Sequence, residues 1–171
     1  MRNQPTFAFK KRAFFAICML LLSVNILTAQ DPKVIKLKND KNNSTLIANN
    51  DDDTPYHLFY SLLPTIYVKN NSIINITGPN RPATLTLYDA NSLNILNTEN
   101  PLFESVQIIK IQLNDISDFN KYVDFSSLKG FDSLGYIHLT CYFDCNENQI
   151  RAFIKNINPE ITIYFEYVNP A

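Results

Sequence analysis

From residue 55 onward the chain alternates between short apolar runs and polar breaks. The runs are rich in Ile, Val, Thr, Tyr and Phe, and Asn, Pro and Ser separate them: LFYSLL, TIYV, SIINIT, ATLTLYDA, VQIIKIQL, GYIHLTCYF and ITIYFEYV. This composition is typical of strands on a half-buried sheet, so each run is predicted to be a strand. A further short strand is expected at residues 34–37, within a stretch that is otherwise polar.

The later runs recur at a regular distance. Their central apolar residues, Leu85, Ile109, Ile137 and Ile161, follow one another at offsets of 24, 28 and 24 residues. Stacked units of one strand and one returning segment produce such a period. Antiparallel neighbours need only a tight turn, so this spacing predicts parallel strands.

Two of the returning segments carry helical signals. Residues 144–158 have Asn146 as an N-cap candidate, apolar residues at helical spacing and Pro159 just after the end, which predicts an amphipathic helix. Residues 116–134 favour either one helix or two short turns.

The run VQIIKIQLNDISDF has the spacing L-x-x-L-x-L-x-x-N-x-L-x-x-L, and its positions are filled by Val106, Ile109, Ile111, Asn114, Ile116 and Phe119. It resembles the leucine-rich repeat. In SLGYIHL the apolar positions recur, but Tyr142 replaces the asparagine. The units around Leu85 and Ile161 keep only the central apolar pair, so the resemblance covers roughly residues 83–168.

The repeat asparagine has a physical role, because its amide can satisfy backbone groups where the chain leaves the sheet. An earlier match around Ile66 and Ile73 is complete in form but lies only 19 residues before the next unit. The same residues are equally consistent with a hairpin that turns at Asn70 and Asn71, and we prefer a hairpin or an N-terminal cap there.

These patterns predict an α/β fold, a short leucine-rich-repeat-like strand and helix repeat with a β-rich N-terminal cap. A right-handed β-helix, which NNSIINITGPNRPATLTLY also resembles, and a small α+β sandwich remain as alternatives. We expect residues 1–29 to be a signal peptide, 30–55 a polar and partly disordered leader, and 56–171 a single repeat-like domain.

The signal peptide is predicted from three features. Lys10, Lys11 and Arg12 precede an apolar run at residues 13–27, and Ala29 offers a small residue for cleavage. The run is too short for a comfortable membrane span of about 20 residues. The protein is therefore expected to be exported, to the periplasm, the cell surface or the medium, and to keep no membrane span after cleavage.

Charge narrows the range of partners. The chain has 15 basic and 16 acidic residues, and four of the basic ones, but no acidic one, lie in the predicted signal. The rest is net acidic, which argues against binding to nucleic acid. The acidic cluster at residues 51–53 lacks the alternating ligands of a calcium loop and is interpreted as surface.

Cys141 and Cys145 remain after the signal and form a candidate disulfide in an exported protein. Four residues of extended chain would separate them by about 13 Å, too far for a bridge, so the chain must turn at residues 142–144. Cys141 and Cys145 could form a zinc site with His138 and Asp144, but their spacing fits no familiar zinc site, so zinc is not favoured. No metal or other cofactor is expected.

Catalysis finds little support in the sequence. His138 and Cys141 are three residues apart in one predicted strand, so their side chains point to opposite faces. The sequence leaves the question of an enzyme open and favours a protein without a catalytic site.

A binding role is the first functional hypothesis. The residues expected to point out of the sheet, in alternation with the inward apolar set, are Lys110, Gln112, His138, Thr140, Thr162, Tyr164 and Glu166. We expect a protein or glycan ligand on this surface. The alternative is an exported carbohydrate-active or carbohydrate-binding protein on a β-helix.

Overall fold

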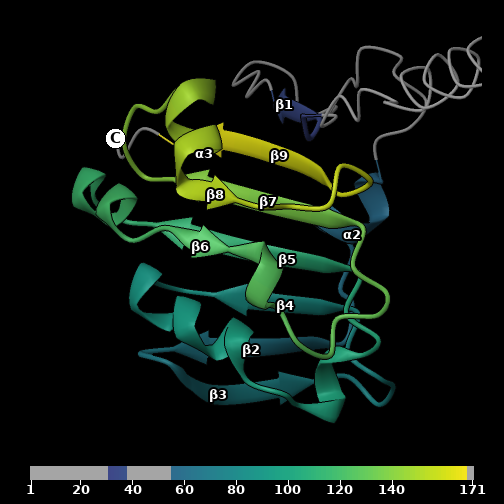
Figure 1. The fold of residues 1–171 in the computed structure, drawn as a ribbon. Coiled ribbons are helices and arrows are strands. Elements are labelled where there is room, and N and C mark those ends of the chain that lie inside the picture. Colours follow the sequence, from purple (N-terminus) through teal and green to yellow (C-terminus); the bar gives the residue numbers. More distant parts are fainter. Residues whose placement is uncertain (1–30, 38–54, 169–171) are drawn as a thin grey trace, which may run out of the picture. The chain divides into compact units, whose positions relative to one another are not determined.

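The computed structural model describes residues 31–37 and 55–168 (Figure 1). The predicted signal peptide and the acidic cluster at 51–53 lie outside the described residues. Among the helices that the structure describes, none has the length and apolar character needed to cross a membrane.

The described residues form a mixed α/β fold around a seven-stranded sheet in the order β1-β9-β7-β5-β4-β2-β3. Neighbouring strands are parallel except β2 and β3. The prediction of parallel strands is confirmed. The strands are β1 (Val34–Lys36), β2 (Thr65–Lys69), β3 (Ser72–Thr77), β4 (Thr84–Leu87), β5 (Ile108–Leu113), β7 (Tyr136–Cys141) and β9 (Thr162–Tyr167).

The register of the sheet corrects the expected spacing at one strand. Leu85 pairs with Ile109 and Ile109 with Ile137, as expected. The next partner is Ile163 rather than Ile161. Ile161 precedes β9, and its amide donates to the Asn158 carbonyl at 2.9 Å in the turn that leads into the strand.

The returning segments cover one face of the sheet, which we call the core face (Figure 1). Most of the apolar core lies between this face and those segments, and Phe103, Phe153 and Phe165 are among its largest buried side chains. The segments comprise the 3-10 helices η1 (Ala90–Asn97), η2 (Pro101–Phe103), η3 (Ile116–Asn120) and η4 (Phe125–Ser127), the short strands β6 (Val123–Asp124) and β8 (Ile154–Lys155), and the helix α3 (Glu147–Phe153).

Helix α3 confirms the predicted N-terminus. Asn146 caps it, and its side chain accepts from the Gln149 amide at 3.1 Å while Gln149 reaches back to the Asn146 amide. The helix ends at Phe153, earlier than the expected 158, because Ile154 and Lys155 extend as β8 and pair with β6. In residues 116–134 the two short turns are correct, as η3 and η4.

The hairpin of β2 and β3 is also confirmed. Asn70 and Asn71 both have positive φ, 50° and 59°, as the two central residues of a type I′ hairpin turn require and as asparagine tolerates. The Asn70 amide donates to Asp89 Oδ2 at 2.9 Å, and the Asn71 amide donates to Ser92 Oγ at 3.1 Å. The turn is therefore tied to the segment that follows β4.

The predicted strand LFYSLL is wrong, because Tyr56–Tyr60 forms the short helix α2. Leu58 and Phe59 are both buried, and they pack with Ile108 and Tyr164 in a second apolar cluster. Consecutive side chains of a strand point to opposite sides, whereas a helical turn lets these two reach the same surface. We call the surface that α2 contacts the outer face of the sheet.

Candidate functional site

The predicted recognition residues lie on the outer face, where the parallel register arranges them in rows. Lys110, His138 and Tyr164 are neighbours across β5, β7 and β9. The next row toward the carboxyl ends holds Gln112, Thr140 and Glu166 in the same way. Thr162 lies in the row on the other side, next to Tyr136. The rows differ in whether another part of the chain covers them.

Helix α2 covers the row of Lys110, His138 and Tyr164. His138 is 7% exposed and Tyr164 is 2% exposed. The Phe59 ring centroid lies 5.1 Å from that of His138 and 4.9 Å from that of Tyr164. Lys110 Nζ donates to the Phe59 carbonyl at 2.7 Å, and desolvation lowers the pKa of Lys110. These side chains hold α2 in place rather than face a ligand.

A contact between His138 and Glu166 borders the covered row. His138 Nε2 lies 3.3 Å from Glu166 Oε1, although Nε2 makes no hydrogen bond of regular geometry. The contact with His138 holds the pKa of Glu166 below its ordinary value; partial burial opposes this, and a hydrogen bond with Thr140 adds to it.

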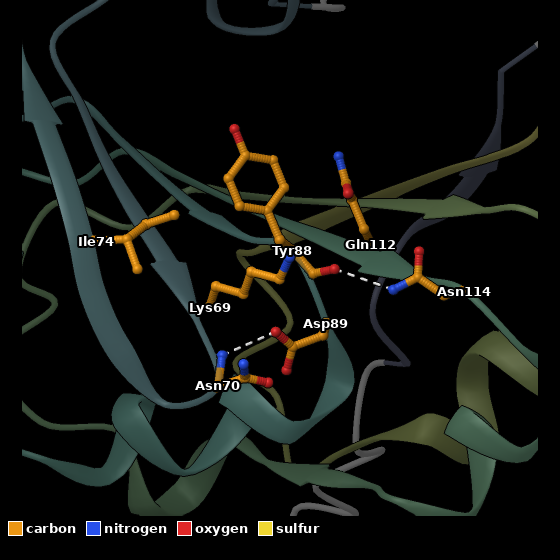
Figure 2. Close-up of a pocket in the computed structure, with 7 residues that line it drawn as sticks. All are labelled: Lys69, Asn70, Ile74, Tyr88, Asp89, Gln112 and Asn114. Atoms are coloured by element: carbon orange, nitrogen blue, oxygen red, sulfur yellow. Dashed lines mark hydrogen bonds between the residues drawn. The ribbon is translucent and has the colours of Figure 1, made fainter.

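An open pocket of about 470 Å³ lies on the outer face at the carboxyl ends of β2, β4 and β5 (Figure 2). Only Gln112 among its residues was predicted. The pocket is lined by Lys69, Asn70, Ile74, Tyr88, Asp89, Gln112 and Asn114. A usable signal was present, because Tyr88 and Asn114 continue the outward alternation of β4 and β5 past the strand ends.

Hydrogen bonds fix the backbone around this pocket. Asp89 accepts from the Asn70 amide through Oδ2 and from Ser92 Oγ through Oδ1, so both carboxylate oxygens are engaged. Asn114 Nδ2 donates to the Tyr88 carbonyl at 3.0 Å (Figure 2). These groups build the pocket, and they leave other polar atoms for a ligand.

The apolar wall of the pocket comes from a β-bulge. The pairing of β2 with β3 shifts between Tyr67 and Val68, and Ile74 has no partner on β2. Ile74 is 55% exposed and lines the pocket. Bulges re-aim side chains, and this one turns Ile74 toward the pocket.

Two stacked tyrosines lie at the same place. The rings of Tyr67 and Tyr88 stack with centroids 5.8 Å apart and planes inclined by 11°. Burial raises the pKa of Tyr88, and Tyr67 and Tyr142 raise it further. Tyr142, which follows β7 by one residue, is 37% exposed.

Cys141 and Cys145 lie on the core side, away from the pocket. Both are buried free thiols, and the chain bends between them. They share a side-chain hydrogen bond. This bond and burial raise the pKa of Cys141, whereas the same bond lowers the pKa of Cys145. Their disulfide stays a prediction.

The described residues contain no group of three or more His, Cys, Asp or Glu side chains placed to hold a metal ion. Cys141 belongs to the core cluster, whereas His138 lies under α2 on the outer face. The two side chains are separated by the sheet and form no catalytic pair.

No family model matches the chain, and searches of curated proteins and of solved structures likewise return no match.

Proposed function

We propose that the protein is an exported binding module that recognises its ligand, a protein or a glycan, on the outer face of the sheet. The observation that carries this proposal is the open pocket at the carboxyl ends of β2, β4 and β5. Crevices at the carboxyl ends of strands are the usual binding places of open α/β sheets. The neighbouring tyrosines add rigid contact area.

We further propose that the scaffold is a short leucine-rich-repeat-like stack capped by the hairpin. Asn114 supports this, because its amide satisfies the Tyr88 carbonyl where the previous strand ends. Val106, Ile109 and Ile111 are buried as the repeat pattern requires. Ile116 departs from it, since this side chain is 60% exposed.

The arrangement of groups supports binding rather than covalent catalysis. In the part of the chain with described side chains, no serine or cysteine is hydrogen bonded to a histidine. Nucleophilic catalysis relies on such a pair. Export is supported by the basic, apolar and small residues of positions 1–29, and an acidic remainder disfavours nucleic acid as ligand.

The test is a binding assay on the purified protein with two sets of probes, an oligosaccharide panel and the secreted and surface proteins of the cells that make it. We expect a ligand from one set to bind, and Tyr88→Ala to weaken it by about tenfold. Tyr122→Ala is the control, because Tyr122 is 57% exposed but does not line the pocket. If neither set contains a ligand, or if Tyr88→Ala and Tyr122→Ala lose the same amount of affinity, the proposal is contradicted.

A further inference from the structure

We propose that the pocket binds a sugar unit of a carbohydrate, a step that rests on the binding function proposed above and names its ligand class. Three features of the pocket support a sugar ligand: its free polar atoms, its apolar walls and the hydrogen bonds that fix its backbone.

The free polar atoms are suited to hydroxyl groups. Neither Lys69 nor Gln112 makes a side-chain hydrogen bond within residues 31–37 and 55–168. Gln112 offers two donors and one acceptor, and Lys69 offers three donors. Asn114 uses Nδ2 on the Tyr88 carbonyl and keeps Oδ1 as an acceptor. Sugar hydroxyls both donate and accept, so several of them on one ring can pair with the donors of Lys69 and Gln112 and with the acceptors of Gln112 and Asn114.

The apolar walls are suited to the C–H face of a sugar ring. Tyr88 is held by the stacked ring of Tyr67, so it loses little side-chain freedom on binding. Ile74 faces the pocket from the bulge on β3 (Figure 2). A pyranose ring has one apolar face and a polar rim, which this combination of walls and amides complements.

The pocket is built before a ligand arrives. Asp89 holds the hairpin turn through the Asn70 amide and through Ser92, and Asn114 holds the end of β4. A ligand therefore does not have to order these loops, which would reduce its affinity. The volume of about 470 Å³ lies within the range of small-ligand pockets.

A protein ligand fits this site less well. The buried centres of protein interfaces are depleted in charged residues, especially lysine, and rich in apolar and aromatic groups. Here a lysine ammonium, a carboxylate and three amides stand beside only two apolar side chains, Ile74 and Tyr88. A protein surface would have to desolvate those polar groups without pairing all of them.

The experiment is calorimetric titration of the purified protein with trisaccharides of glucose, mannose, galactose, xylose, N-acetylglucosamine and galacturonic acid. We expect at least one to bind, and both Tyr88→Ala and Gln112→Ala to weaken it by about tenfold or more. The matched controls are Tyr122→Ala and Gln107→Ala, which alter exposed residues outside the pocket lining and are expected to bind as the unchanged protein does. Circular dichroism establishes that each variant is folded.

Two results overturn the inference: no binding of any trisaccharide at about 10 mM, or equal affinity in the pocket variants and their controls. The proposed function is judged separately. If a protein binds and Tyr88→Ala abolishes that binding, while no sugar binds, the proposed binding function stands and the carbohydrate inference is wrong. If neither proteins nor sugars bind, both proposals are wrong.

Discussion

Two regions of the outer face have the same alternation in sequence but different surroundings. In the covered region, Lys110, His138 and Tyr164 lie beneath α2 and contact Phe59. In the open region, Lys69, Gln112 and the other pocket residues line a cavity beyond the reach of that helix. Strand parity therefore tells which face a side chain is on, but a five-residue helix elsewhere in the chain decides whether that side chain is exposed.

Some side chains of the two regions differ in whether they make hydrogen bonds within the protein. In the covered region, Lys110 is engaged within the fold, because its Nζ donates to the Phe59 carbonyl. Lys69 and Gln112 of the open region have no such bond among the described residues and can serve a ligand. Substitutions are thus expected to change stability in the first region and binding in the second.

The largest effect is expected in the covered region from Phe59→Ala. Phe59 is 7% exposed and its ring contacts both His138 and Tyr164. Removing it leaves a cavity between α2 and the sheet, and we expect the free energy of unfolding to fall by about 3 kcal/mol. Urea denaturation followed by circular dichroism measures the change.

Leu62→Ala is the control for that variant. Leu62 follows α2 by two residues and is 105% exposed, so its loss should change the free energy of unfolding by less than about 0.5 kcal/mol. If Phe59→Ala is as mild as this control, then α2 is not packed stably and the two regions do not differ in the way described.

The strands and their facing could be predicted because both follow from local sequence. β-branched and aromatic runs marked six strands of the sheet, and period-two alternation separated Ile109 and Ile111 from Lys110 and Gln112. The run LFYSLL could not be assigned in this way. A short apolar run fits a strand and a helical turn equally, and contacts with distant Ile108 and Tyr164 decided it.

The pocket was largely missed because it is assembled from three strand ends and a bulge. Tyr88 and Asn114 lie one residue beyond β4 and β5, where a strand pattern ends. Ile74 faces the pocket only because the register of β2 and β3 shifts. An alternation pattern predicts neither the residue at which a strand ends nor the position of a bulge.

An intermediate effect is expected from Glu166, which sits at the border of the covered region. Its pKa is lowered in the fold from an ordinary value of 4.5 by the contact with His138. The stability that this contact contributes is present above the unfolded-state value and is lost as the pH falls through the lower folded-state value. Glu166→Gln should therefore flatten the loss of stability in acid.

Urea midpoints at about pH 6 and about pH 3 measure this effect. The unchanged protein should lose more stability between the two pH values than Glu166→Gln does. Glu160→Gln is the matched control, because Glu160 is exposed and forms no salt bridge in the described part of the chain. Parallel pH profiles for Glu166→Gln and the unchanged protein would show that the contact does not stabilise the fold.

The smallest effect on stability is expected from Gln112→Ala in the open region. Its side chain makes no hydrogen bond within the described ranges, so its removal breaks no internal contact of that kind, and the free energy of unfolding should stay within about 0.5 kcal/mol. Urea denaturation under the same conditions as for Phe59→Ala measures it. A loss close to that of Phe59→Ala would mean that Gln112 supports the sheet, and that its effect on binding reflects folding rather than contact with a ligand.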